Sequence, residues 1–261
     1  MRLFTDTVTP EDKALAVGVR NHLRAGRRVI GNPGIGLKKT LKKLEEKLEQ
    51  KTTSKTDWEL KQPELIAQIA MTKAGIEGEE RLCEYLSNLV KYENDLSDIV
   101  CFASLSFDDG RENKDYIPDT DTILVYGKNI LIIDAKNLKI KSTEVYHLSN
   151  GVVSDHKEKP LIEVHSSVPI WEKVFNNAGI EIESIKGYVC VVGDIPMQIE
   201  DGDDDLTLIH IAQLKNILKE WVKDKSSDTE LKLLTEIAKA QIREEKKLSF
   251  DVEKIKKQLG V

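Results

Sequence analysis

Three acidic residues and one lysine stand at regular spacing around a short turn in the middle of the chain. The run from Asp119 to Lys136 contains two apolar segments separated by a Gly-Lys pair, and a two-residue turn there would form a β-hairpin. In that register Asp121 lies opposite Asp134 and Asp119 lies opposite Lys136, with all four side chains on one face. Such a cluster is costly unless its charge is compensated, and a divalent cation would compensate it. The pattern predicts metal-dependent hydrolysis of phosphodiester bonds, although a surface patch with an Asp–Lys ion pair fits it as well.

Both segments of this hairpin are apolar on their two faces. One face is expected to carry Ile123, Val125, Ile130 and Ile132, and the other Leu124, Leu131 and Ile133. A strand pair that is apolar on both sides is usually covered on both sides, as in α/β proteins. The hairpin is therefore predicted to belong to the core of the protein.

A helix expected before the hairpin offers a further carboxylate. Glu79 stands at the start of an apolar stripe that continues through Leu82, Leu86 and Leu89, whereas Glu80 falls on the polar face. Two interpretations of Glu79 are open. It reaches a catalytic site, or it stabilises the N-terminus of the helix through the helix dipole.

The order of the expected elements predicts an α/β fold with a mixed sheet flanked by helices. Three parts are expected: a basic helical arm and linker over 1–62, a main domain over 63–225, and a charged helical tail over 226–261. Helices are expected at 10–27, from Leu37 onward, at 63–92 with an interruption near Gly75–Gly78, at 170–178 and at 212–223; strands are expected at 99–106, 119–126, 129–137, 144–148 and 186–193.

Charge is distributed unevenly along the chain of 261 residues. Residues 1–62 contain 14 Lys or Arg and 8 Asp or Glu, whereas the remainder contains 25 and 37. A basic arm can contact nucleic acid, but it can equally dock on the acidic body of its own protein. The candidate nucleic-acid-binding residues are Lys38, Lys39, Lys42, Lys43 and Lys139.

Several other kinds of site are disfavoured by the pattern. No apolar run is long enough to cross a bilayer and the first residues lack a signal-peptide core, so no membrane partner and a cytoplasmic location are expected. Cys83, Cys101 and Cys190 are scattered and are expected to be buried thiols in a reducing compartment. The run Gly31–Gly36 is followed by Leu and not by Lys-Thr, which disfavours a phosphate-binding loop.

The acidic residues and the lysine occur in an order that resembles the NERD (nuclease-related) domain, a branch of the PD-(D/E)xK nuclease superfamily. The resemblance is carried by Gly75-Ile-Glu-Gly-Glu79 at a helix start, by Asp121 opening a strand, and by Asp134-Ala-Lys136-Asn137 after the next strand. It covers about residues 70–195. Asp134 stands where the family more often has Glu. No Gln stands at the helix start near Trp171, where relatives often have one, and this tryptophan is expected either to stack on a base or to lie in the core.

The resemblance implies a restriction-endonuclease-like sheet and an endonuclease that depends on Mg²⁺ or Mn²⁺ and acts on nucleic acid, DNA rather than RNA. It implies that Asp121, Asp134 and the carbonyl of Ala135 hold the cation, with Glu79 completing the site directly or through water. Lys136 would orient and help deprotonate the attacking water and offset transition-state charge. One alternative is a catalytically silent nucleic-acid-binding or assembly module on the same fold. Another is a small-molecule phosphodiesterase or nucleotide-responsive effector.

Overall fold

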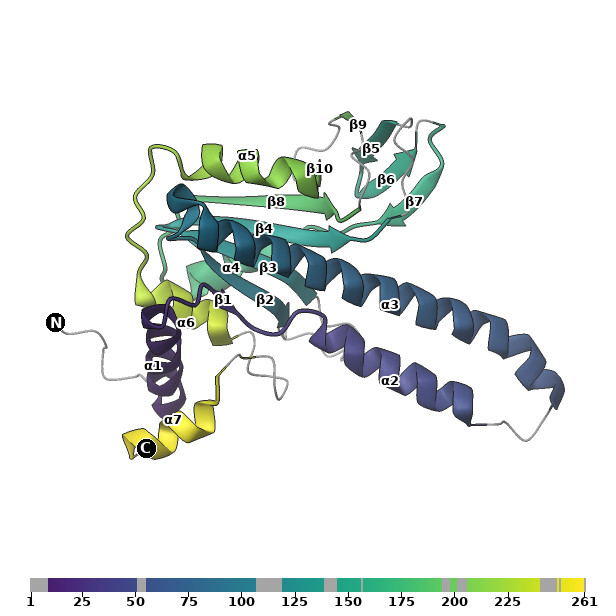
Figure 1. Ribbon diagram of the computed structural model, residues 1–261, viewed down its shortest axis with the longest axis horizontal. Helices are drawn as coiled ribbons and strands as arrows, with labels where there is room; N and C mark the ends of the chain where they lie inside the picture. Colours follow the sequence, from purple (N-terminus) through teal and green to yellow (C-terminus); the bar gives the residue numbers. More distant parts are fainter. Residues whose placement is uncertain are drawn as a thin grey trace.

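The centre of the molecule is a mixed six-stranded sheet (Figure 1). The computed structural model describes residues 9–50, 55–106, 119–138, 145–155, 157–193, 198–200, 206–239, 248 and 250–260. In spatial order the strands are β1 (Val29–Ile30), β2 (Val100–Ser106), β3 (Asp119–Tyr126), β4 (Asn129–Lys136), β8 (Ser184–Val191) and β10 (Leu206–His210). Strands β2, β3 and β4 are antiparallel to one another, whereas β1 runs parallel to β2, and β4, β8 and β10 are mutually parallel.

Helices cover both faces of this sheet, which confirms the predicted α/β arrangement. The helices are α1 (Pro10–Arg24), α2 (Ile35–Glu49), α3 (Lys55–Tyr92), η1 (Asn94–Leu96), α4 (Val168–Asn177), α5 (Ile211–Val222), α6 (Leu231–Lys239) and α7 (Val252–Leu259). One apolar cluster joins α1, α4 and α6 to one face of the sheet, and a second joins α3, η1 and α5 to the other. No helix within the described residues has the length and apolar composition needed to cross a bilayer.

The β3–β4 hairpin pairs in the predicted register. Tyr126 lies opposite Asn129 and Thr122 lies opposite Ile133, so the residues of the two strands are paired as expected from the sequence. Gly127 opens the turn with φ 59°, a conformation that residues with a Cβ adopt at a cost. One face of the hairpin packs into the α1, α4 and α6 cluster and the other face into the α3 and α5 cluster. Both faces are therefore buried.

A second sheet packs beside the carboxyl ends of the parallel strands. Its strands, in spatial order, are β7 (Pro160–Glu163), β6 (Val152–Asp155), β5 (Val145–Ser149) and β9 (Gln198–Glu200). A third apolar cluster joins Tyr146 and Val153 of this sheet to Val189 and Leu208 of the central sheet. Of these four strands, only β5 is anticipated by the sequence pattern. The others are only three or four residues long, too short for a pattern along the chain to identify them.

The segment 1–62 was expected to be separate from the rest, but its described part is integrated into the body. Leu15 and Val19 of α1 are fully buried in the core, and Ile30 of β1 pairs with Phe102 of β2. The expected boundary at residue 62 falls inside α3, which is continuous over 38 residues. The predicted interruption near Gly75–Gly78 is also wrong, because tertiary packing at these glycines holds the helix together.

The C-terminal segment likewise differs from a charged tail on the surface. Leu233, Leu234 and Ile237 of α6 are buried in the core, where they pack near α1. Its charged side chains face outward or pair, as Lys239 does with Asp12 at 3.0 Å. The helical spacing was predicted, but the apolar side of α6 packs into the core and α6 is not part of a separate tail.

Helices α2 and α3 form a hairpin whose outer part projects from the body (Figure 1). Ion pairs join the two helices: Lys38 Nζ lies 2.5 Å from Glu80 Oε1, and Lys73 Nζ lies 3.1 Å from Glu45 Oε1. Part of the basic arm is therefore docked on acidic residues of the same chain. The base of this hairpin covers the ends of strands β3 and β4.

Candidate functional site

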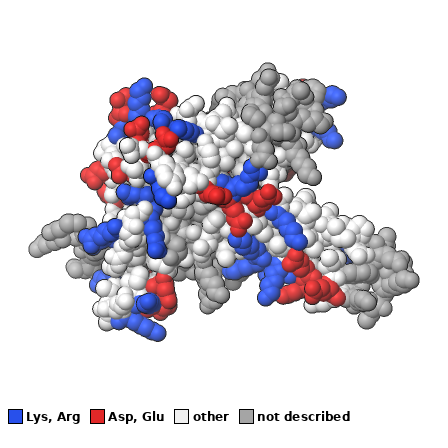
Figure 2. Space-filling view, in the orientation of Figure 1, with Lys and Arg blue, Asp and Glu red and all other residues white. Residues whose placement is uncertain are grey.

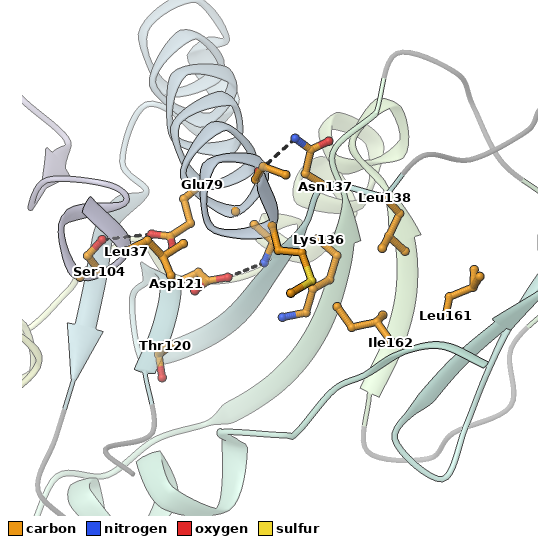
Figure 3. A pocket seen from close by; sticks show the side chains of 15 residues that line it. Leu37, Glu79, Ser104, Thr120, Asp121, Lys136, Asn137, Leu138, Leu161 and Ile162 are labelled. Atoms are coloured by element: carbon orange, nitrogen blue, oxygen red, sulfur yellow. Dashed lines mark hydrogen bonds between the residues drawn. The ribbon is translucent and has the colours of Figure 1, made fainter. Parts of the chain in front are cut away.

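A cavity of about 430 Å³ lies where the α2–α3 hairpin meets the ends of the central strands (Figure 3). Its walls come from α2, α3, β2, β3, β4 and β7, so segments far apart in the sequence contribute to it. The lining residues are Gly36, Leu37, Met71, Ala74, Gly75, Glu79, Ser104, Thr120, Asp121, Ala135, Lys136, Asn137, Leu138, Leu161 and Ile162. Four of the five residues proposed from the sequence as catalytic or metal-binding are among them: Glu79, Asp121, Ala135 and Lys136.

Asp121, Asp134 and Lys136 form one contiguous polar group. Lys136 Nζ donates to Asp134 Oδ1 at 2.8 Å, and the backbone N–H of Ala135 donates to Asp121 Oδ2 at 2.7 Å. The carboxyl group of Asp134 is close enough to that of Asp121 to raise its pKa. Asp134 is not among the residues that line the cavity and reaches the site through Asp121 and Lys136. The side chain of Asp119, placed opposite Lys136 by the register, lies outside the described residues.

Burial and neighbouring charges shift the pKa values of Asp121 and Lys136. Burial raises the pKa of Asp121 well above its usual value, and the negative charges of Asp134 and Glu79 raise it further, whereas Lys136 opposes them. Burial alone would lower the pKa of Lys136, but the carboxylates of Asp134, Asp121 and Glu79 outweigh burial and raise it. Because both pKa values are raised, Asp121 and Lys136 each keep a proton to a higher pH than the free side chains would. Neighbouring negative charge contributes to both shifts, whereas burial is the largest cause at Asp121 and opposes the shift at Lys136.

Glu79 is fixed at the cavity by two hydrogen bonds. Its Oε2 accepts from the backbone N–H of Gly34 at 2.8 Å and from the hydroxyl of Ser104 at 3.2 Å (Figure 3). Glu79 lies well inside α3, because the helix begins at Lys55, so the interpretation that it stabilises the helix N-terminus is wrong. The apolar stripe did predict that it faces inward.

Two residues that support Glu79 were missed in the sequence. Gly34 belongs to the glycine-rich turn whose spacing disfavours a phosphate loop, and here the turn supplies an N–H to a carboxylate instead. Gly34 has φ 69°, and a Cβ at this position would approach Ile76 Cγ2 to 3.2 Å. Ser104 has φ 55° within β2, an unfavourable conformation for a residue with a side chain. No sequence signal marks Ser104, because its role depends on the pairing of β2 with β3.

The two glycines of the Gly-x-x-Gly-Glu motif allow close packing around Glu79. A Cβ on Gly75 would approach Leu37 Cδ1 of α2 to 2.8 Å, and a Cβ on Gly78 would approach Asn137 Cβ to 3.1 Å. Asn137, directly after β4, donates from Nδ2 to the carbonyl of Ala74 at 3.0 Å. The helix is thus held against the end of the strand that carries Lys136. The spacing of the motif fixes the distance between Glu79 and that strand.

The donor set of the site suits a hard divalent cation through two side chains. Asp121 and Asp134 supply adjoining carboxylates, and Ala135, whose carbonyl is the third expected ligand, lines the cavity. Glu79 already accepts hydrogen bonds from Gly34 and Ser104, so contact with the cation through a water molecule fits it better than direct ligation. Within the described part of the chain, no three His, Cys, Asp or Glu side chains are grouped closely enough to hold a metal ion by themselves.

The basic residues proposed for nucleic-acid contact are placed near the cavity only in part. Lys38 follows the lining residues Gly36 and Leu37 and pairs with Glu80. Lys42 is 80% exposed and lies 3.8 Å from Glu46. Figure 2 shows basic side chains near the base of the projecting hairpin and acidic ones farther out, so both signs share this face. Lys39 and Lys43 lie on the same helix, α2, as expected from the sequence. Lys139 lies outside the described residues.

Two other expectations are settled by burial. Trp171 is fully buried, stacks near Phe175 and donates from Nε1 to Thr120 Oγ1 at 3.1 Å, so it has a core role and cannot stack on a base. Cys83, Cys101 and Cys190 are buried free thiols, as the scattered spacing predicted. Burial raises the pKa of Cys190 to about 12, which keeps the thiol protonated.

Comparison of the chain with protein-family models, with curated proteins and with solved structures gave no match.

Proposed function

We propose that this protein is a metal-dependent nuclease of the PD-(D/E)xK type and that its central sheet is restriction-endonuclease-like. The observation that carries the proposal is the pair of adjoining carboxyl groups of Asp121 and Asp134 beside Lys136 at the cavity. Two adjoining carboxyl groups that are both only partly exposed are costly to ionise together, and such perturbed groups are often found at functional sites. A cation bound there and a phosphate bound beside it would each relieve part of this charge imbalance.

The roles of the residues follow from their contacts. Asp121, Asp134 and the carbonyl of Ala135 would hold Mg²⁺ or Mn²⁺, and Glu79 would act through water because its Oε2 is engaged. The cation would supply Lewis-acid activation of the attacking water and of the scissile phosphate. The backbone N–H of Ala135 fixes the orientation of the Asp121 carboxylate before any ligand arrives.

Lys136 is best suited to stabilise negative charge on the phosphate. The neighbouring carboxylates raise its pKa, so the side chain stays cationic and is a poor acceptor for a proton from water. This part of the proposal differs from the expectation that Lys136 helps to deprotonate the attacking water. A fixed cation beside the scissile phosphate lowers the energy of the transition state without moving a proton.

The test is cleavage of supercoiled plasmid, single-stranded DNA and RNA by the purified protein with Mg²⁺, with Mn²⁺ or with EDTA. We expect metal-dependent cutting, with DNA preferred over RNA, that is lost in Asp134→Ala and in Lys136→Ala. Lys128→Ala is a matched control, because Lys128 sits at the opposite end of the same hairpin and pairs with Glu181. Full activity in Asp134→Ala, or no cutting of any substrate by folded wild-type protein, would refute the proposal.

One observation favours a second candidate, a catalytically silent nucleic-acid-binding module on the same fold. Glu79 is committed to Gly34 and Ser104, and no group of three metal-binding side chains occurs among the described residues. Such a module would bind nucleic acid equally well with EDTA and with Mg²⁺. Calorimetric titration with Mg²⁺ separates the two, because the nuclease binds the ion through Asp121 and Asp134 and the silent module does not.

A further inference from the structure

We infer that the cavity receives an unpaired nucleotide, so that the substrate is a single strand or the unpaired end of a duplex. This inference rests on the proposed function and specifies its substrate class. It comes from the half of the cavity that the proposed chemistry does not use. That half is apolar, and it lies within the same cavity as the carboxylates and Lys136.

The cavity has two chemically different sides. Figure 3 shows Glu79, Ser104 and Asp121 on one side and Leu138, Ile162 and Leu161 on the other, with Lys136 between them. A phosphodiester is matched by Lys136, but it has no use for the apolar wall. A nucleotide, by contrast, carries a charged phosphate and a flat base a few bonds apart. The arrangement fits one phosphate beside Lys136 and one base against the apolar wall.

Two of the apolar residues that line the cavity are exposed to solvent. Met71 of α3 is 67% exposed and Leu161 of β7 is 42% exposed. These two are among only five large apolar side chains that are exposed within the described residues, and both line the same cavity. Large apolar residues that gather at one exposed place mark a binding surface more often than chance placement.

The apolar character of the wall favours a strand with unpaired bases over a duplex. In a duplex the bases are stacked inside and the outer surface is sugar and phosphate, so an apolar wall gains nothing from it. An unpaired base presents its flat face, which an apolar surface can cover and remove from water. Two lysines are available to the backbone of such a strand. Lys136 lies in the cavity beside the carboxylates, and Lys38, which pairs with Glu80, lies directly after the lining residue Leu37. The apolar and basic groups together match one polyanion with accessible bases.

The experiment measures binding by fluorescence anisotropy in EDTA, where the proposed cleavage is blocked. Three labelled probes are compared: a single-stranded DNA oligonucleotide, a hairpin duplex of the same length, and a single strand in which abasic sites replace the bases. For wild-type protein we expect the single strand to bind about tenfold more tightly than either of the other two probes. The difference between the first and third probes isolates the contribution of the bases.

The variants separate the wall from the rest of the protein. Met71→Glu and Leu161→Glu should remove most of the preference for bases, whereas Met71→Leu should keep it because the wall stays apolar. Leu259→Glu is the matched control, since Leu259 on α7 is 44% exposed and lies outside the cavity. All these positions are exposed, so folding is expected to survive the changes.

Equal affinity for the single strand and the duplex, equal affinity with and without bases, or a preference unchanged in both wall variants would overturn the inference. Absence of binding to every probe would overturn it as well. These results are distinct from failure of the nuclease proposal. A protein that prefers unpaired bases through Met71 and Leu161 but never cleaves would retain the inference and lose the activity.

Discussion

Replacing Gly78 by alanine tests how the motif holds helix α3 against strand β4. In a helix interior alanine is favoured over glycine by about 1 kcal/mol, so propensity alone predicts a more stable protein. The added Cβ, however, would lie 3.1 Å from Asn137 Cβ and 3.5 Å from its backbone N. Asn137 has little freedom to retreat, because its Nδ2 is bonded to Ala74 of the same helix and the preceding residue Lys136 accepts from Val192 N–H at 2.9 Å.

The crowding is expected to outweigh the gain in propensity. Overpacking of a tight contact costs about 1–3 kcal/mol, so the Gly78→Ala variant should lose about 1 kcal/mol of unfolding free energy in total. Gly75→Ala is the matched control on the same helix. Its Cβ would meet Leu37 Cδ1 at 2.8 Å, which is the tip of a flexible side chain that can rotate away. Propensity should therefore dominate at Gly75, and that variant should be unchanged or slightly more stable.

The assay is thermal and urea unfolding of both variants beside the wild type. A loss of about 1 kcal/mol lowers the melting temperature by about 2–4 °C in a protein of this size. Gly78→Ala should also move Glu79 away from the end of strand β4, and so weaken binding of Mg²⁺ at the proposed site. The reasoning is refuted if Gly78→Ala proves as stable as Gly75→Ala, because the packing contact would then have no energetic weight.

Three further predictions concern the groups around the carboxylates. The raised pKa of Asp121 means that its ionised form opposes folding, so without metal Asp121→Asn should stabilise the protein at neutral pH. This advantage should vanish below the usual pKa of an aspartate, because the carboxyl group is then protonated in both the folded and the unfolded state. Unfolding measured from pH 3 to 8 in EDTA checks the sign. Glu79→Ala should cost about 2 kcal/mol, since it leaves the N–H of Gly34 without its carboxylate, whereas Glu79→Gln keeps an acceptor and should cost less; equal losses in urea unfolding would contradict this. Ser104→Gly should be about 1 kcal/mol more stable than Ser104→Ala, because both lose the hydroxyl but only glycine relieves φ 55°; calorimetry that ranks alanine first would show that the backbone there is not strained.

The parts of the fold that were predicted correctly depend on contacts between neighbours in the sequence. The β3–β4 hairpin follows from two continuous apolar runs and a glycine turn, and its register places Asp121 and Asp134 in adjacent positions without knowledge of any other element. The inward orientation of Glu79 follows from helical spacing in the same way. Two of the metal-binding candidates and the position of Lys136 were thus available from one short stretch of chain.

The elements that were missed depend on contacts between distant segments. β1 has two residues and exists because it pairs with β2, about 70 positions later, and β10 is placed by β8. The continuity of α3 through Gly75 and Gly78 was missed for the same reason, since each glycine is tolerated where another element packs closely. Local propensity is a weak signal when tertiary packing opposes it.

The sequence by itself determined which charged residues of the candidate site lie together, because residue types and a register of period two decide which carboxylates share one face of a hairpin. Only the tertiary structure decided what surrounds these residues. Gly34 and Ser104 bind Glu79, and α3 and β7 bring Met71 and Leu161 to one cavity, from positions as far as 90 residues apart. Alternation and helical periodicity carry information over a few residues, whereas the walls of a cavity depend on how whole elements pack.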